Sequence, residues 1–178
     1  MNIFRFQNNK IALVGLLFFG IATLLSFSGC GVYSFTGASI PAGAKTVSVQ
    51  YFPNKASLVV PTLSPAFTEA LRDKFTRQTN LVMVERNGDM AMEGEITEYR
   101  TTPVAIQGDQ TAALNRLTIT VHVRFTNKLE PSKDFDQNFS QFKDYPSTSD
   151  LNAVQSELIA DIVELLTDDI FNKAVINW

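Results

Sequence analysis

Cysteine and histidine are almost absent from this chain of 178 residues, which has one of each, Cys30 and His122. A single cysteine cannot form a disulfide within the chain, so folding must depend on an apolar core. The sequence also lacks paired-cysteine metal motifs, glycine-rich phosphate loops and the nucleophile elbow of serine hydrolases. These absences disfavour hydrolase or transferase activity, and no metal site is expected.

Basic residues are too few for the positively charged surface of a nucleic-acid-binding protein. Lys and Arg together number 15 against 18 Asp and Glu, a net charge of −3. Two of the basic residues, Arg5 and Lys10, lie in the first 29 residues, which hold no acidic residue, so residues 30–178 carry a net charge of −5. We therefore expect no nucleic-acid partner.

The first thirty residues have the layout of a secretory signal. Arg5 and Lys10 form a positive head, residues 11–27 are almost wholly apolar, and two small residues precede Cys30. The apolar run is shorter than the roughly 18 to 20 residues of a transmembrane helix. We predict that residues 1–29 are a signal peptide. A membrane-spanning helix, or a free core cysteine that happens to follow an apolar run, is the alternative.

Residues 25–30, Leu-Ser-Phe-Ser-Gly-Cys, resemble the bacterial lipobox, although Phe27 stands where leucine is usual. The resemblance implies that Cys30 carries an N-acyl diacylglycerol group and becomes the new N-terminus, and we expect no other cofactor. Each buried methylene adds about 0.8 kcal/mol, so several acyl chains anchor a protein firmly. We predict an acylated tether at residues 30–45, followed by one domain at residues 46–178.

The first half of this domain has the pattern of a strand, a helix and a hairpin. A strand is predicted at residues 46–52, with Val47, Val49 and Tyr51 on its buried face and Ser48 and Gln50 on its polar face. Apolar residues every four positions predict a helix from Leu63 to about Asn80, with Ser64 as its N-cap. A short strand at residues 81–86 and the turn signal at residues 87–89 predict a hairpin. Its second arm begins at Met90, has a bulge near Glu98 and ends in a loop over residues 101–111.

The second half has the pattern of two strands and a long helix. Residues 117–126 alternate clearly, and residues 139–145 predict an edge strand. Residues 147–150 offer N-caps for a helix with an apolar stripe formed by Leu151, Val154, Leu158, Ile162, Leu165, Leu166, Ile170 and Phe171. The order predicts an α+β fold: a two-layer sandwich with two amphipathic helices on one face of a largely antiparallel or mixed sheet of four to five strands.

Charged residues on the predicted polar surfaces are the candidates for function. Arg100, Arg116 and Arg124 border the long hairpin and suit contacts with lipid phosphates or an acidic loop of a partner, although ordinary solvated arginines are the alternative. His122 shares that face and is expected to be a surface residue. The last helix carries an acidic row that we expect to be solvated: Glu157, Asp161, Glu164 and Asp168.

Several segments, taken together with the lipoprotein signal, resemble the LptE family of lipopolysaccharide-assembly lipoproteins in its Bacteroidetes-like form. The resemblance covers essentially all of the chain after the signal. The segments that carry it are Cys30-Gly31-Val32-Tyr33-Ser34-Phe35-Thr36-Gly37, Ser39-Ile40-Pro41, Lys45-Thr46-Val47-Ser48-Val49, Tyr51-Phe52-Pro53-Asn54 and Phe67-Thr68-Glu69-Ala70-Leu71-Arg72-Asp73-Lys74-Phe75.

This resemblance implies a periplasm-facing lipoprotein of the outer membrane that is not an enzyme. Its partners would be an LptD-type β-barrel, which it would plug and help to assemble, and lipopolysaccharide. Arg100, Arg116 and Arg124 are then candidate contacts with the barrel or with lipopolysaccharide. Two alternatives stay open: an independent periplasmic lipid carrier or other outer-membrane assembly lipoprotein, which as a carrier would need an apolar cavity, and a small anchored enzyme, which would need a catalytic cluster around His122.

Overall fold

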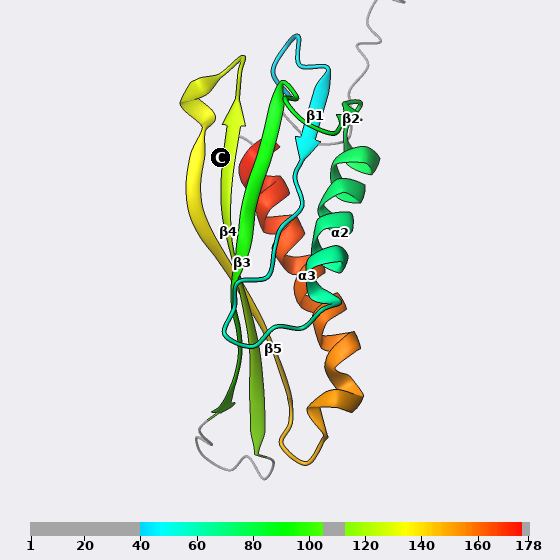
Figure 1. Ribbon diagram of the computed structural model, residues 1–178, viewed down its shortest axis with the longest axis vertical. Coiled ribbons are helices and arrows are strands. Elements are labelled where there is room, and N and C mark those ends of the chain that lie inside the picture. Colours follow the sequence, from blue (N-terminus) through cyan, green and yellow to red (C-terminus); the bar gives the residue numbers. More distant parts are fainter. Residues whose placement is uncertain (1–39, 105–112, 176–178) are drawn as a thin grey trace, which may run out of the picture. The chain divides into compact units, whose positions relative to one another are not determined.

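The computed structural model describes residues 40–104 and 113–175, which form a helical layer on one face of a sheet (Figure 1). The sheet has five strands in the order β2-β1-β3-β4-β5. The elements along the chain are β1 (Thr46–Val49), α2 (Leu63–Gln78), β2 (Val82–Val84), β3 (Met90–Val104), β4 (Leu114–Asn127), the short 3-10 helix η2 (Pro131–Lys133), β5 (Phe135–Pro146) and α3 (Leu151–Val175). This arrangement confirms the predicted α+β two-layer fold.

Helix α2 buries the predicted stripe, since Leu63, Phe67, Leu71 and Phe75 are all fully buried. The N-cap prediction at Ser64 was wrong. The helix already begins at Leu63, because a turn in which the Leu63 N–H donates to the Val60 carbonyl (3.1 Å) starts it. The proline that follows Ser64 therefore lies inside the first turn, where its missing N–H costs nothing.

Helix α3 is capped within the predicted segment, because the Asp150 carboxylate accepts a hydrogen bond from the Asn152 N–H (3.0 Å). Most of the predicted apolar stripe is buried. Leu151 and Val154 are partly buried and Leu165 is 37% exposed, whereas Ile159 and Val163, which the predicted stripe did not include, are buried. Because α3 packs against α2 as well as the sheet, its buried stripe turns toward α2 and leaves Leu165 outside.

Strand β1 is shorter than predicted and is the centre of a parallel three-stranded region. Regular pairing ends after Gln50 and resumes only at a single bridge between Asn54 and Ile96 of β3, so Tyr51 does not continue the buried face and is 57% exposed. Ser48, predicted on the polar side, is buried because the Gly88 N–H lies over it and donates to its hydroxyl (3.2 Å). A Cβ at Gly88 would lie 2.6 Å from the Ser48 nitrogen, so only glycine fits this crossing.

The predicted hairpin between β2 and β3 was wrong, because β1 lies between them and is parallel to both. The turn at residues 87–89 instead carries the chain across β1, with Asn87 at a φ of 58°. There the Asp89 carboxylate accepts hydrogen bonds from the N–H groups of Lys45 and Thr46, each 2.9 Å long. These bonds, with a third from the Thr46 hydroxyl, lower the pKa of Asp89 and so favour its ionised carboxylate at the crossing.

Strands β3 and β4 form a long antiparallel pair with the predicted bulge, which lies between Ile96 and Glu98. The bulge turns Tyr99 into the core, where Gln155 Nε2 donates to its hydroxyl (2.7 Å) and burial raises the pKa of that hydroxyl. The predicted loop begins too early, because β3 continues to Val104. Pro103 is tolerated there because β1 pairs only with the start of β3, so this end of β3 is an edge.

Candidate functional site

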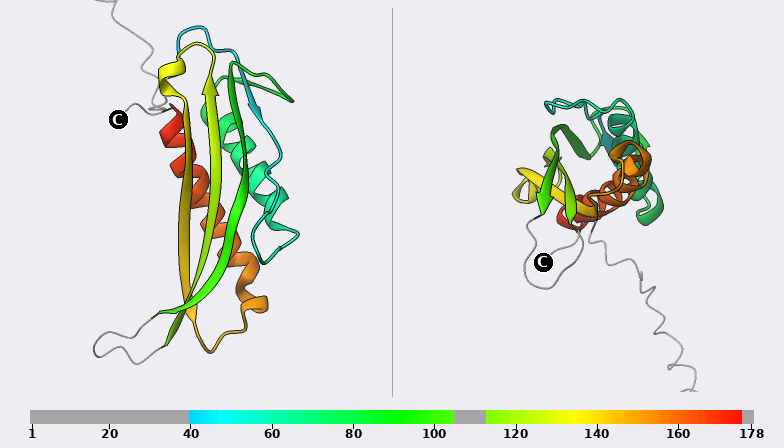
Figure 2. Two further views of the ribbon diagram at one scale, coloured as in Figure 1. Left: turned by 60° about the vertical axis from the view of Figure 1, so that its left-hand side comes forward. Right: turned by 90° about the horizontal axis from the view of Figure 1, so that it is seen from below.

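The outward side of β3, β4 and β5 forms one polar surface opposite the helices, called here the polar sheet face (Figure 2). This face arises because successive side chains of a strand point to opposite sides of the sheet. The polar residues of β4 alternate with Ile119, Val121 and Val123, which point to the other side and are fully buried. The polar sheet face consists of Glu93, Glu95, Glu98, Arg100, Arg116, Thr118, Thr120, His122, Arg124, Asp136, Asn138, Ser140, Phe142 and Asp144.

The register of β3, β4 and β5 places oppositely charged residues of neighbouring strands side by side, in rows that run across the sheet. Arg124 on β4 lies between Glu93 on β3 and Asp136 on β5, at 3.3 and 3.1 Å. Arg116 makes a two-bond contact with Asp144, at 2.7 and 2.9 Å. Hydrogen bonds from these two guanidinium groups lower the pKa of Asp136 and Asp144, respectively. The positive charges of these rows are therefore balanced within the sheet.

Arg100 completes the trio of candidate arginines on the same face. Its Nε lies 2.8 Å from Glu98, and its side chain is 60% exposed, more than that of either other arginine. Each of the three therefore contacts a carboxylate of its own surface. Arg100 is the most accessible of them, and we expect it to exchange its carboxylate for an incoming anion most readily.

Phe142 is an apolar side chain on this polar surface that the sequence analysis did not single out. It is 45% exposed, and the Arg116 guanidinium lies over its ring at 3.7 Å from the centroid, a cation–π contact. Phe139 and Tyr145, which have the opposite strand parity, are buried. Strict alternation along residues 139–145 would have placed Phe142 on the outer face.

His122 lies on the polar sheet face as expected. Its Nε2 is 2.5 Å from Asp136 Oδ1, and it lines an open hollow of about 410 Å³ together with Gln50, Tyr51, Pro53, Glu93, Gly94, Glu95 and Arg124. That lining contains no serine or cysteine to serve as a nucleophile. Within residues 40–104 and 113–175, no three histidine, cysteine or carboxylate side chains are placed to hold a metal ion.

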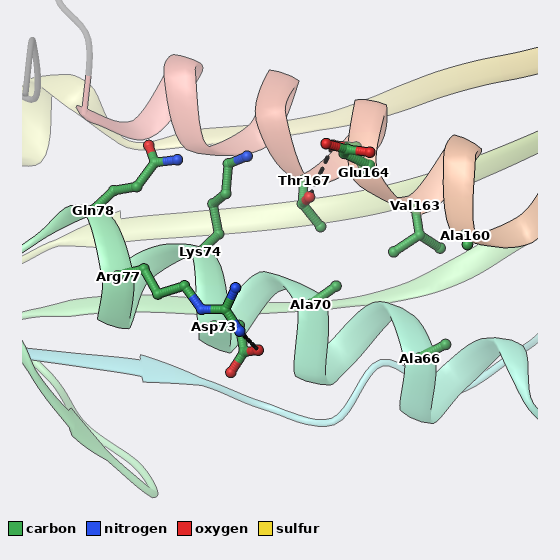
Figure 3. Close-up of a pocket in the computed structure, with 10 residues that line it drawn as sticks. All are labelled: Ala66, Ala70, Asp73, Lys74, Arg77, Gln78, Ala160, Val163, Glu164 and Thr167. Carbon is green, nitrogen blue, oxygen red and sulfur yellow. Dashed lines mark hydrogen bonds and ion pairs between the residues drawn. The ribbon is translucent and has the colours of Figure 1, made fainter.

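The outward side of the two helices forms an open groove of about 420 Å³ (Figure 3). Small residues, including Ala66, Ala70 and Ala160, form its floor, and charged residues border it. Two members of the acidic row, which remain partly exposed to solvent as expected, also form ion pairs: Asp168 with Lys74 of α2, and Asp161 with Lys143 of β5 (3.1 Å). These pairs link α3 to the elements on both of its sides.

The layer between sheet and helices is filled by one continuous apolar core. Its largest fully buried side chains include Phe52, Phe67, Phe75 and Phe125, and the rings of Phe75 and Phe171 meet edge to face at 5.0 Å. Such packing occupies the space in which a lipid carrier would hold acyl chains.

The structure defines an α+β domain with a charge-paired sheet face and a filled apolar core. The particular family is clear from sequence: the family model LptE, lipopolysaccharide-assembly, matches residues 44–174, and the chain belongs to this family. The family consists of outer-membrane lipoproteins with a role in lipopolysaccharide assembly. Within the described part of the chain, no helix is both long and apolar enough to cross a membrane.

Solved structures with a similar arrangement share little sequence with this chain. A minor lipoprotein from Acinetobacter baumannii is 14% identical, with 73% of this chain and 91% of that chain covered and a TM-score of 0.49. Lipoprotein B from Nitrosomonas europaea is 10% identical, with 80% and 88% covered and a TM-score of 0.49. A PelC dodecamer from Paraburkholderia phytofirmans is 15% identical, with 70% and 87% covered and a TM-score of 0.37. No curated protein matches the chain.

Proposed function

We propose that this chain is a lipid-anchored component of the lipopolysaccharide translocon of the outer membrane. In this proposal it sits inside an LptD-type β-barrel, plugs the barrel, assists its assembly and helps to deliver lipopolysaccharide to the outer leaflet. The observation that carries the proposal is the LptE family match over residues 44–174, which spans every described strand and nearly all of α3.

The polar sheet face suits contact with a polar barrel lumen. A charged side chain that is covered by a partner loses its hydration, which costs several kcal/mol unless another charge compensates it. Arg116 and Arg124 already have carboxylate partners at 2.7 to 3.3 Å, so covering this face leaves neither of them unpaired. Phe142 adds apolar contact area to the same surface. A rigid domain of this kind can occupy a lumen without any bond being made or broken.

The candidate arginines are proposed as contacts with the barrel or with lipopolysaccharide. Guanidinium groups bind phosphate with two parallel hydrogen bonds. Arg100 is the best placed, because it is the most exposed of the three and, among the described residues, makes an ion pair with Glu98 alone. Arg116 and Arg124 form ion pairs with carboxylates on β5. We therefore expect them to set the shape and charge pattern of the face that the partner contacts, and not to bind phosphate themselves.

Anchoring is proposed to come from the acylated Cys30, after removal of residues 1–29 as a signal peptide. Both lie outside the described residues, as does most of the tether at residues 30–45. The acyl chains would hold the domain on the periplasmic side of the outer membrane.

Depletion of the chain in its native cells tests the proposal. We expect lipopolysaccharide at the cell surface, measured with an antibody on intact cells, to fall as the chain is lost, while total lipopolysaccharide persists inside the cell. Re-expression of the wild-type chain and of a His122→Ala variant should restore the surface signal equally, because no catalysis by His122 is involved. An unchanged surface signal after depletion would overturn the proposal, and failure of His122→Ala alone would favour the anchored enzyme.

A further inference from the structure

Strand β5 is the outer edge of the sheet along its whole length. It pairs with β4 from Phe135 to Pro146 in an unbroken register, and it has no described strand on its other side. Native edge strands are normally protected by bulges, prolines or outward lysines. Here the first eleven residues contain no proline, and Lys143 is held by Asp161 of α3 at 3.1 Å. Within residues 40–104 and 113–175, no strand pairs with the outward N–H and C=O groups of β5, so another strand can bind them.

Exposed apolar side chains flank this edge on both faces. Phe142, on the polar sheet face, is 45% exposed, and Leu165, on α3, is 37% exposed. Leu165 lies four residues from both Asp161 and Asp169, and these two carboxylates contact Lys143 and Gln141 of β5. Residues four apart share one side of a helix, so Leu165 is on the side of α3 that borders β5.

We infer that the free edge of β5 is a docking site for an extended segment of a partner polypeptide, which pairs with it as an additional strand. Main-chain hydrogen bonds would supply much of the affinity, and alternate side chains would supply specificity. One apolar residue of the segment contacts Phe142 on one face, and its neighbour along the segment contacts Leu165 on the other. Asp136, Asp144 and Asp161 beside the edge already pair with Arg124, Arg116 and Lys143. Asp169 instead accepts a hydrogen bond from the uncharged Gln141 amide (2.6 Å), so the segment carries a basic residue, beside its apolar ones, that faces Asp169.

A second copy of this chain does not fit the same edge. Helix α3 runs alongside β5 beneath the sheet, tied to it through Gln141 and Lys143 (Figure 2). Paired strands are about 4.8 Å apart, whereas packed helices need about 8 to 10 Å between their axes. In an antiparallel pairing, which keeps both helices on one face of the sheet, a second β5 would bring its own α3 into the space of the first. In a parallel pairing, the second α3 would lie on the opposite face, beside the charged polar sheet face and not beside Leu165. The occupant is therefore a strand without a helix on this side.

This inference stands apart from the barrel partnership, since a barrel can enclose the domain without pairing with β5. Photo-crosslinking in the native membrane tests it, with a benzophenone amino acid placed at Phe142, at Leu165 or at Val82. Val82 is the matched control because it is 63% exposed and lies on β2, the opposite edge of the sheet. Crosslinked peptides are identified by mass spectrometry.

We expect positions 142 and 165 to link to the same short stretch of one other protein, with about tenfold more adduct to that stretch than at position 82, because Val82 lies at the opposite edge of the sheet. Adducts with β5 of a second copy, adducts with unrelated stretches, or yields equal to those at position 82 would overturn the inference. If the barrel still co-purifies in that case, the proposed function stands while this inference fails.

Lysine substitutions provide an independent measurement. Phe142→Lys and Leu165→Lys each introduce a charge beside the edge, and each is expected to weaken capture of the crosslinked partner about thirty-fold, as expected for a central interface residue. Val82→Lys should leave capture unchanged. Each variant is expected to unfold at close to the wild-type temperature, because all three side chains are exposed, and thermal unfolding measures this. Equal capture by all three variants would contradict the inference.

Discussion

Replacement of Phe75 by alanine is expected to lower the free energy of unfolding by about 3 to 5 kcal/mol. Phe75 is fully buried, and its ring packs edge to face against Phe171 at a centroid distance of 5.0 Å. This contact joins α2 to α3, so its loss removes apolar burial and leaves a cavity between the two helices. Urea unfolding followed by circular dichroism measures the change.

Phe142→Ala is the matched control, because it removes the same ring from an exposed position. Its loss of stability should stay below about 1 kcal/mol, since it gives up the contact with Arg116 and little buried area. Equal destabilisation by the two variants would contradict the packing described between the helices.

Replacement of Gly94 by alanine is expected to destabilise the sheet by about 3 kcal/mol, at the upper end of the range for overpacked cores. A Cβ at Gly94 would lie 2.0 Å from the carbonyl oxygen of His122 and 2.8 Å from the ring of Phe52. The first neighbour is backbone, so β3 and β4 would have to separate. Thermal unfolding checks the effect.

Asn138→Ala serves as the control for this variant, because it changes an exposed side chain in the same sheet and should alter stability by less than about 0.5 kcal/mol. A Gly94→Ala protein that unfolds at the wild-type temperature would show that β3 and β4 do not approach as closely as described.

The helices and the long antiparallel strands could be predicted because their buried residues repeat with the period of the element. Phe67 and Phe75 on α2, and Val121 and Val123 on β4, are buried as that period requires. The position of β1 between β2 and β3 could not be predicted. The turn signal at residues 87–89 shows that the chain turns there, but not whether the two strands that it joins pair with each other or lie on either side of a third strand. Burial of Ser48 follows from that crossing and was missed with it.

The candidate site was predictable only in part. Alternation along residues 117–126 correctly placed His122 and Arg124 on one face, whereas Arg116 joins them because β4 already begins at Leu114. The carboxylates that pair with the arginines, Asp136 and Asp144, come from β5, and only the cross-strand register brings them opposite. Leu165 and Phe142 were not recognised as exposed. Both were counted as apolar residues of a predicted element, and apolar character alone does not show whether a side chain lies in the core or at the surface.

The most direct test of the account is affinity purification of the chain from native outer membranes, followed by quantification of the proteins and lipopolysaccharide that accompany it. We expect an LptD-type β-barrel to co-purify in nearly equal amount, together with lipopolysaccharide. Recovery of the chain alone, from cells in which that barrel is present and assembled, would contradict the proposal that it works inside the barrel.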